Sequence, residues 1–385
     1  MNIGVIMEAN PFHLGHQYLF DQIKERFDPD CLTVITTTSF NMRGDISPIN
    51  KFNKTKYILQ AGANIVIELP TFYAVQSADI FGYYAVKSLN ELNVTDIVCG
   101  CETDDIYDLI TLIEETETIE YQNTLRALLK EQKLSYKVAC SKALEALNVD
   151  EELIKLFNSP NATLAISYLK AINIINPYIN LRLIKRYKTE YDSLEENDNI
   201  ASATSLRMKL LNNENINNFI PFEQEFIDLK SANEKYFELI KYQLLLNYDK
   251  ITYNSEGIIN YIIKNATWNK DYETFINSLS NKKYTKSRIK RTILHSLINQ
   301  NIDFNQKETY LRLLGFDKIG IEYISNLPKE NKNNIFSSVK ELNNEFNTPI
   351  LNNELKTTKL FDIISNSETY IKEYQLPIRK EQLWH

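Results

Sequence analysis

The sequence predicts an α/β protein in which a parallel sheet, covered by helices, is followed by an all-helical C-terminal part. In the first hundred residues, short runs rich in Val and Ile alternate with segments whose apolar residues have helical spacing. Six of the nine glycines lie in the same hundred residues. Beyond residue 222 the pattern is almost entirely helical. Strands separated by helix-length connections pair in parallel, so the first observation fixes the type of sheet.

Five strands are expected, at Asn2–Met7, Leu32–Thr37, Asn64–Leu69, Asp96–Cys99 and Leu181–Lys185. The helices between the first four strands are expected at His16–Arg26, Lys51–Gln60 and Ser77–Leu92. Gly62 is a C-cap for the second helix, and Pro70 stops the third strand. Ligands of such sheets bind beyond the carboxyl ends of the strands, where Gly15, Gly44 and Gly100 are expected in loops.

The rest of the chain divides at an asparagine-rich stretch, Asn212–Asn218, that precedes Pro221. Before it, Asp104–Ile175 is mainly helical, Asp192–Asn199 is a polar loop and Ala201–Leu210 contains a further helix start. After it, helices are expected at Tyr236–Leu245, Ile258–Lys264 and Ser287–Ile298, among others. We therefore predict two domains, residues 1–220 and 221–385.

Composition excludes several classes of protein. With 385 residues, 43% hydrophobic and 24% charged, the chain is neither disordered nor fibrous. The N-terminus has no basic leader, and no apolar run approaches the roughly 18 residues of a membrane span. The four cysteines are too few for a disulfide framework and lack zinc spacing, so no metal site is expected. We expect a cytoplasmic protein that does not bind a membrane.

The net charge of -7 hides an uneven distribution. Eight acids and no Lys or Arg lie between Cys101 and Tyr121. Six cations and no acid lie in one ten-residue segment, Lys282, Lys283, Lys286, Arg288, Lys290 and Arg291. Solvated helix surface is the ordinary interpretation of both runs. Because close like charges repel, the basic run also fits an anionic partner.

Two of the four histidines lie in the segment Glu8–His16, which joins the first strand to the first helix. Pro11 sets the turn, and Gly15 leaves room for a ligand near the backbone. His13 and His16 are three residues apart at a helix N-terminus, where free N–H groups suit a polyphosphate. Two imidazole donors there would stabilise charge that develops on an attacked α-phosphate. The alternative is a pair of surface histidines in a capping turn.

The His-x-Gly-His motif after the first strand resembles the nucleotidyltransferase superfamily, which includes class I aminoacyl-tRNA synthetases. A longer series of motifs resembles the tRNA(Met) cytidine acetate ligase family over nearly the whole chain. The series is Asn10–His16, Met42–Asp45, Ile67–Pro70, Gly100-x-Glu102, Ser202–Arg207, Lys283-Tyr-Thr-x-x-Arg288 and Tyr310–Phe316.

The resemblance implies a Rossmann-like nucleotidyltransferase domain in residues 1–220 and a helical tRNA-binding domain in residues 221–385. It implies that ATP, with Mg²⁺, and acetate give acetyl-adenylate and pyrophosphate. The acetyl group then passes to N4 of the wobble cytidine of elongator tRNA(Met), and DNA is not a partner. Acetate is a poor acyl donor until one of its oxygens is joined to AMP as part of a good leaving group, and the sequence offers no evident Ser–His or Cys–His pair for a covalent intermediate.

The resemblance also implies roles for particular residues. The catalytic residues are His13, His16 and Arg207. The nucleotide-binding residues are Met7, Glu8, Asn10, Pro11, Phe12, Gly15, Gly100, Asn161, Arg186, Ser202, Thr204 and Ser205. The substrate-binding residues are Arg43 for acetate or a phosphate, and Lys282, Lys283, Lys286, Arg288 and Arg291 for tRNA. From the sequence alone, Ser202 is also a plain N-cap, Asn161 a helix cap, Arg186 a surface charge and Arg43 a partner of Asp45.

Some residues stay open or depart from the family pattern. Glu68 is expected to be a buried structural carboxylate, and Arg312 has no role that the sequence assigns. Thr37-Thr38 replaces the usual Ser-Gly pair, Lys54 an Arg, and Ala162 a second Asn. Two rival functions remain: a small-molecule adenylyltransferase of the same superfamily, and a non-catalytic RNA-binding protein.

Overall fold

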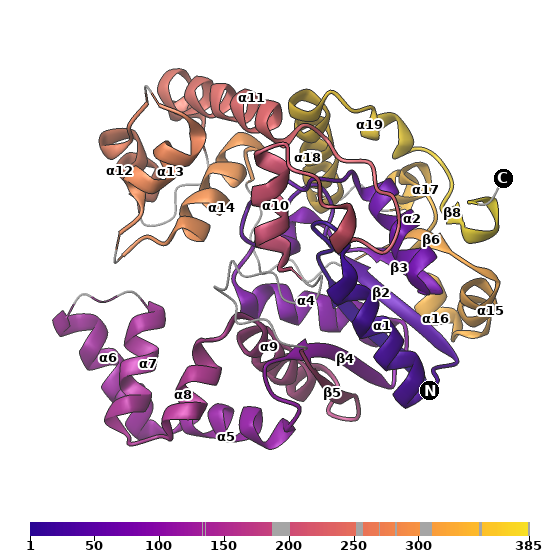
Figure 1. Ribbon diagram of the computed structural model, residues 1–385, viewed down its shortest axis with the longest axis horizontal. Coiled ribbons are helices and arrows are strands. Elements are labelled where there is room, and N and C mark those ends of the chain that lie inside the picture. The colour runs from indigo at the N-terminus through magenta and orange to yellow at the C-terminus, as the bar shows by residue number, and fades with distance from the viewer. Residues whose placement is uncertain are drawn as a thin grey trace.

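A single sheet forms the centre of the computed structural model, which describes residues 1–132, 134, 136–186, 201–251, 257–268, 270–281, 283–300, 310–345 and 349–383. The strand order is β5-β4-β1-β2-β3-β6-β7, and β8 pairs with β6 beside this path (Figure 1). The strands are β1 (Asn2–Met7), β2 (Cys31–Thr36), β3 (Ile65–Glu68), β4 (Asp96–Cys101), β5 (Asn180–Lys185), β6 (Leu311–Phe316), β7 (Ile335–Phe336) and β8 (Ile378–Arg379). The first five pair in parallel, so their carboxyl ends lie along one edge.

Helices cover both faces of the sheet, because alternate residues of each strand are apolar on opposite sides. On one face Ile3 and Val5 of β1 pack with Phe20 of α1 (Leu14–Phe27) and Ile58 of α2 (Lys51–Ala61). The opposite face packs against α4 (Ala78–Glu91) and α9 (Pro160–Ile175). The helices α4 and α9 approach closely at Gly82, where an added Cβ would lie 2.6 Å from Ser167 Oγ.

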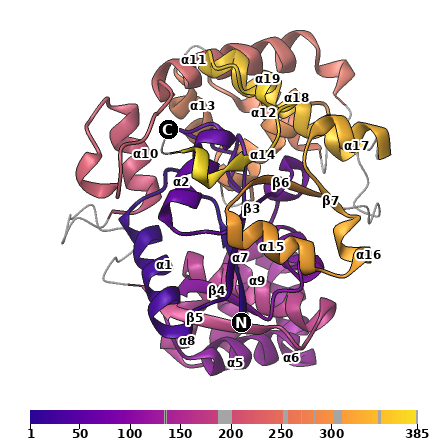
Figure 2. The same ribbon diagram turned by 90° about the vertical axis from the view of Figure 1, so that its right-hand side faces the viewer.

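The remaining helices form two groups on opposite sides of the molecule (Figures 1 and 2). One group contains α5 (Ile106–Glu117), α6 (Ile119–Gln132), α7 (Tyr136–Ala146) and α8 (Glu151–Asn158). The other contains α10 (Ala203–Leu211), α11 (Leu229–Lys241), a π-helical turn (Tyr242–Leu246), α12 (Ile258–Asn265), α13 (Tyr272–Leu279), α14 (Lys286–Leu297), α18 (Pro349–Ser365) and α19 (Thr369–Lys372). Shorter or peripheral helices are α3 (Thr71–Ala74), α15 (Lys318–Asn326), α16 (Lys329–Lys332), α17 (Val339–Glu345) and the 3-10 turns Asn217–Phe219, Tyr248–Lys250 and Lys380–Gln382.

The predicted fold class is confirmed: a mostly parallel α/β sheet is followed by a largely helical C-terminal part. Each of the five expected strands is present within two residues of its predicted ends. The expected loop at Asp192–Asn199 lies outside the described residues. The division after residue 220 stays a prediction. Within the part of the chain that the structure describes, no helix has both the length and the apolar character to cross a membrane.

The expectation that the C-terminal part is all helical is wrong for three short segments, β6, β7 and β8, of which β6 pairs antiparallel with β3. Leu311, Leu313 and Leu314 are buried, and leucine by itself favours a helix. The open edge of β3 offers unpaired backbone groups, so tertiary pairing overrides the local preference. After the helices that precede β6, the chain therefore returns to the sheet that β1–β5 form.

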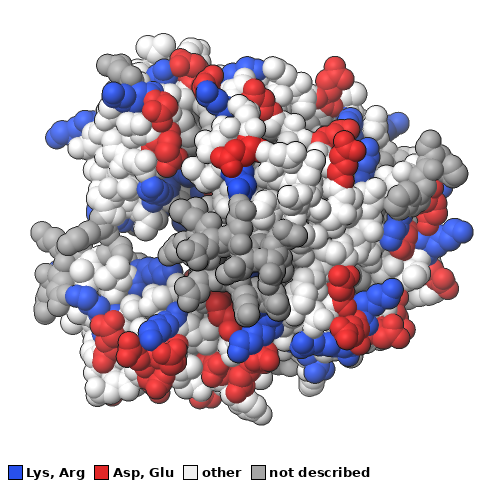
Figure 3. Space-filling model, viewed as in Figure 1, with Lys and Arg blue, Asp and Glu red and all other residues white. Residues whose placement is uncertain are grey.

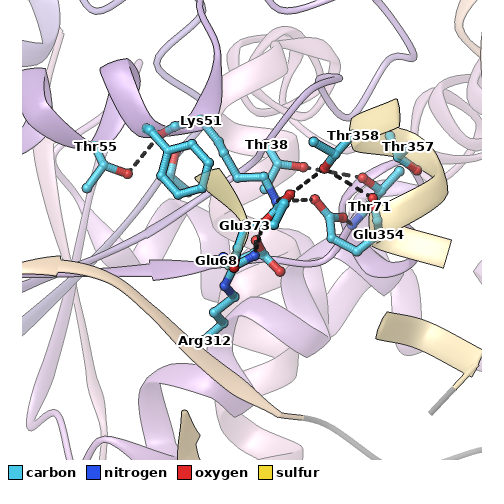
Figure 4. A network of polar contacts seen from close by, with 12 residues as sticks. Thr38, Lys51, Thr55, Glu68, Thr71, Arg312, Glu354, Thr357, Thr358 and Glu373 are labelled. Atoms are coloured by element: carbon cyan, nitrogen blue, oxygen red, sulfur yellow. Dashed lines mark hydrogen bonds and ion pairs between the residues drawn. The ribbon is translucent and has the colours of Figure 1, made fainter. Parts of the chain in front are cut away.

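A buried ion-pair network fixes this returning segment (Figure 4). Lys51 Nζ lies 2.8 Å from Glu68 Oε2, 2.9 Å from Glu354 Oε1 and 2.7 Å from Glu373 Oε1. Arg312 pairs with Glu373 and with Glu68, and no member is more than 1% exposed. Glu68 is thus the structural carboxylate that the sequence predicts, and Arg312 gains a structural role. The network links α2 and β3 to α18 and to Glu373, which follows α19.

Candidate functional site

A cavity of about 240 Å³ opens at the carboxyl ends of β1, β4 and β5. Thirteen of the predicted site residues line it: Met7, Glu8, Asn10, His13, Gly15, His16, Arg43, Gly100, Asn161, Arg186, Ser202, Thr204 and Arg207. These residues come from six separate stretches of sequence. The fold therefore brings most of the predicted nucleotide site together at one edge of the sheet.

Three of the predicted nucleotide-binding residues do not line the cavity. The Phe12 ring is fully buried and packs against Phe222, with ring centroids 5.8 Å apart, so this side chain belongs to the core. Pro11 shapes the turn through a cis peptide bond with Asn10. Ser205 donates its backbone N–H to Ser202 Oγ in the N-cap of α10. The prediction that Pro11, Phe12 and Ser205 contact the nucleotide therefore has no support from their placement.

His13 and His16 form the N-terminal cap of α1, and their rings stack with centroids 3.8 Å apart. The Gly15 backbone N–H donates to His13 Nδ1 over 3.0 Å, and the His13 backbone N–H donates to His16 Nδ1 over 3.2 Å. Each Nδ1 is therefore an acceptor, which leaves the ring proton on Nε2. The cap thus fixes the tautomer of both rings.

The electrostatic surroundings keep both imidazoles neutral. Burial, with Arg186 and Lys54 nearby, lowers the pKa of His16 to about 3. Burial, followed by His16 and the same arginine, also holds the pKa of His13 well below its ordinary value. Two neutral Nε2–H donors are consequently present at a helix N-terminus, the position that the sequence predicts for these histidines.

Arg207 connects α10 to the turn that carries the histidines. Its Nη1 donates to the Asn10 carbonyl over 2.9 Å, and its Nη2 donates to Thr204 Oγ1 over 3.2 Å. Ser202, the N-cap of α10, also lines the cavity. The capping role of Ser202 is confirmed, and it leaves Ser202 and Arg207 beside the same cavity as the histidine pair.

A second cation, Arg186, lies just beyond the end of β5, where its Nη1 donates to Asn161 Oδ1 over 3.2 Å. Asn161 in turn donates to Glu102 Oε1 over 2.8 Å, and Glu102 Oε2 accepts the Ala162 backbone N–H over 2.9 Å. Glu102 therefore orients this side of the cavity, a role that the sequence analysis missed. The departure at Ala162 leaves this contact intact, because the contact uses the backbone.

Gly100 lies inside β4 rather than in a loop after it. A Cβ at this position would meet Arg186 Cγ at 3.5 Å, an ordinary contact, so the protein itself does not require glycine there. Because the position lines the cavity, the absent side chain leaves space for a ligand.

The loop Asn41–Asp45 joins the cavity to the basic helix α14. Gly44 has a φ of +85°, and an added Cβ would lie 2.9 Å from the Arg291 backbone nitrogen. Asp45 pairs with Lys290 at 2.8 Å and with Arg207 at 3.7 Å. The charges of Arg207 and Lys290, with burial opposing them, lower the pKa of this carboxyl. The cavity and the basic helix therefore share one carboxylate.

Within the predicted tRNA-binding cluster the cations differ in their surroundings. Lys283 and Arg288 lie over the Tyr284 ring, 5.0 and 5.4 Å from its centroid, and this ring is 5% exposed. Tyr284 thus packs inside the helical part instead of offering a stacking face. The Lys286 side chain is 53% exposed and 3.9 Å from Glu273. Lys282 lies outside the described residues.

Acidic and basic side chains are interspersed on the face shown in Figure 3, where acids gather along the lower edge over α5 and α8. The described residues contain no group of three or more His, Cys, Asp or Glu side chains placed to hold a metal ion. The four cysteines are free and buried.

Several known proteins resemble this chain. The family model described as HIGH Nucleotidyl Transferase matches residues 1–375. A tRNA(Met) cytidine acetate ligase from Fusobacterium nucleatum is 35% identical over 380 residues, covering 92% of this chain and 93% of that protein. One from Clostridium perfringens is 33% identical, covering 97% and 98%.

Solved structures also match this chain. The apo crystal structure of Thermotoga maritima TmcAL has a TM-score of 0.84 and 25% identity, covering 98% of this chain and 99% of that one. A second structure of that protein, bound with alpha-thio ATP, has a TM-score of 0.78 at 24% identity and shows the shared fold.

Proposed function

The chain belongs to the tRNA(Met) cytidine acetate ligase family of HIGH nucleotidyl transferases, and we propose that it acetylates N4 of the wobble cytidine of elongator tRNA(Met) with acetate and ATP. The observation that carries this proposal is the stacked pair His13–His16. Their neutral Nε2–H groups share a cavity with Arg186 and Arg207, at the carboxyl edge of a parallel sheet. This arrangement suits a reaction on a nucleotide phosphate.

In the first step, an acetate oxygen attacks the α-phosphorus of ATP, the bond to the β-phosphate oxygen breaks, and pyrophosphate leaves. Negative charge builds on the α-phosphate oxygens, and the Nε2–H groups of His13 and His16 donate to them. Arg207 and the Ser202 hydroxyl bind the β- and γ-phosphates, with the N-terminus of α10 nearby. No covalent enzyme intermediate is needed.

In this proposal Mg²⁺ would enter the cavity with ATP. The described residues contain no cluster of metal ligands. The Glu8 carboxylate lies at the cavity wall and would supply one oxygen ligand, of the kind that Mg²⁺ accepts. Mg²⁺ would supply further neutralisation of the phosphate charge.

In the second step, the N4 amine of the cytidine attacks the acetyl carbonyl carbon of acetyl-adenylate. The bond between this carbon and the AMP oxygen breaks, AMP leaves, and N4 loses one proton. The cations of α14 contact tRNA phosphates, with the exposed Lys286 and the half-buried Arg288 as candidates. Lys290 contributes less, since its ammonium already pairs with Asp45. A tRNA substrate places the enzyme in the cytoplasm.

A labelling experiment tests this function against its rivals. The protein is incubated with ATP, labelled acetate and bulk tRNA, and the tRNA is digested and searched for N4-acetylcytidine. We expect label in that nucleoside only. Label confined to small molecules would favour a small-molecule adenylyltransferase, and no ATP turnover would favour a non-catalytic RNA-binding protein.

The His16→Ala variant links the activity to the cavity. Removing one charge-stabilising donor lowers such rates by at least about 100-fold, so acetyl-adenylate formation should be nearly abolished while tRNA binding persists. A control variant, Lys155→Ala, changes a residue whose side chain is 61% exposed and should keep full activity. Unchanged activity of His16→Ala would contradict the assignment.

A further inference from the structure

Asn10 carries a buried donor with no partner in the described residues. The side chain is 1% exposed and lies at the cavity wall, in the turn between β1 and α1. Its Oδ1 accepts hydrogen bonds from Ser47 Oγ and from Lys54 Nζ, each over 2.8 Å, while its Nδ2 has none. Because an unmet buried N–H group is costly, such a donor beside a cavity points to an acceptor on a bound ligand.

The direction of an Asn amide is normally ambiguous, since its O and N differ little in shape, but Lys54 resolves it here. Burial, opposed by the charge of Glu8, lowers the pKa of Lys54 to about 7. Below that pH the ammonium has three N–H groups and no acceptor, so the amide atom that faces Nζ is the oxygen. Ser47 does not decide the matter alone, because its single hydroxyl proton is shared between Asn10 Oδ1 and the Ile49 carbonyl, which is 2.7 Å away.

Lys54 itself has no donor left for a substrate. Its fully buried Nζ lies 3.1 Å from each of the Thr37 and Thr38 carbonyl oxygens, in addition to the contact with Asn10. Three acceptors therefore occupy its three N–H groups. Lys54, on α2, holds the end of β2 against the turn that follows β1, and any effect on substrate passes through Asn10.

We propose that Lys54 is a positioning residue that locks the Asn10 amide with Nδ2 toward the cavity, where it donates to an anionic oxygen of the substrate. This inference rests on the proposed function. Two substrates carry such an oxygen: the carboxylate of acetate and the phosphates of ATP. The departures from the family pattern at Lys54 and at Thr37-Thr38 lie in contact with each other. Lys54 Nζ contacts only the backbone oxygens of the two threonines, so this contact does not depend on their side chains.

Asn10→Asp is the most direct variant. It keeps an oxygen for Lys54 and for Ser47, so folding is preserved, but it replaces the donor with a negatively charged oxygen. In acetate-dependent ATP–pyrophosphate exchange at pH 6.5, kcat/KM should fall about 10- to 100-fold, the cost of a hydrogen bond to a charged group. A rise in KM for acetate alone identifies the carboxylate as acceptor, and a rise in KM for ATP identifies a phosphate. Wild-type kcat/KM in this variant would overturn the proposal.

A double-mutant cycle separates positioning from a purely structural role. Lys54→Met should lower kcat/KM in the wild-type background and add little in an Asn10→Ala background, because Lys54 acts through Asn10. Lys54→Arg keeps the donors and should restore most of the activity that Lys54→Met loses. The surface variant Lys155→Met controls for the substitution itself. Equal losses from Lys54→Met in both backgrounds would refute the proposal.

Measurements on the same proteins distinguish failure of this inference from failure of the proposed function. If wild type exchanges pyrophosphate without requiring acetate, the proposed function fails, and ATP binding measured by calorimetry still reports on Asn10. In that measurement Asn10→Asp should weaken ATP affinity, and unchanged affinity would contradict the role of the amide.

Discussion

Replacing Lys51 by Met should strongly destabilise the fold, because it removes the ammonium that three buried carboxylates share. At an effective dielectric constant of about 20, a charge contact near 2.8 Å is worth about 6 kcal/mol before desolvation. Desolvation of each ion offsets several kcal/mol. The measured cost of breaking one such buried pair is about 3–5 kcal/mol, which is our expected loss of unfolding free energy.

Urea unfolding at pH 7, followed by circular dichroism, measures this loss. Lys155→Met is the matched control, since Lys155 pairs with Glu151 and Glu152 on the surface and should change stability by less than about 0.5 kcal/mol. A loss below about 1 kcal/mol for Lys51→Met would refute the reasoning, because the three carboxylates would then not depend on the ammonium.

The loss of stability in Lys51→Met should also change with pH in a definite direction. Lys51 and Arg312 lower the pKa of Glu373 to about 2 against the effect of burial. A depressed carboxyl pKa contributes stability above its unfolded value near 4.5 that is lost as pH falls toward 2. In Lys51→Met the unpaired carboxylates take up protons more readily, so the deficit relative to wild type should shrink between pH 7 and pH 5. A deficit that grows over this range would contradict the account.

Three further predictions concern the site. The imidazole ¹⁵N shifts of His16 should stay those of the neutral Nε2–H tautomer from pH 8 down to about pH 4, since its pKa lies at about 3; a midpoint near 6.5 would contradict the buried cap. Gly44→Ala should cost about 1–3 kcal/mol of unfolding free energy, because its φ is +85° and α14 leaves no room for a Cβ; unchanged urea unfolding would show that the loop does not pack as described. Lys286→Ala combined with Arg288→Ala should weaken tRNA binding about 10-fold and reduce its salt dependence, while pyrophosphate exchange stays at the wild-type rate. Wild-type tRNA affinity in this variant would show that the cluster is solvated surface without a role in tRNA binding.

The first five strands could be predicted because their signal is local. Runs rich in Val and Ile predict the strands, the helix-length segments between the first four predict their parallel pairing, and the His-x-Gly-His motif falls at the first strand end. Strand β6 lacks that signal: its leucines fit a helix equally well, and only the open edge of β3 decides. A local pattern cannot report a partner that lies some 250 residues earlier.

The polar contacts of the ion-pair network and of the site were unpredictable for the same reason. Arg312 pairs with Glu373, which is 61 residues away in the sequence, and Lys54 donates to Asn10, which is 44 residues away. Gly82 is likewise explained only by the fold, because α4 packs so closely on α9 that a Cβ at this position would clash. The sequence indicated which residue types gather at the cavity, while the fold determines which atoms they present.

The measurement that tests the central claim most directly is exchange of labelled pyrophosphate into ATP by the wild-type protein without tRNA. Activation of acetate in the His13–His16 cavity precedes any contact with tRNA in this account. Exchange should therefore require acetate, proceed without tRNA and vanish in His16→Ala. Exchange that requires tRNA, or that proceeds equally well without acetate, would contradict it.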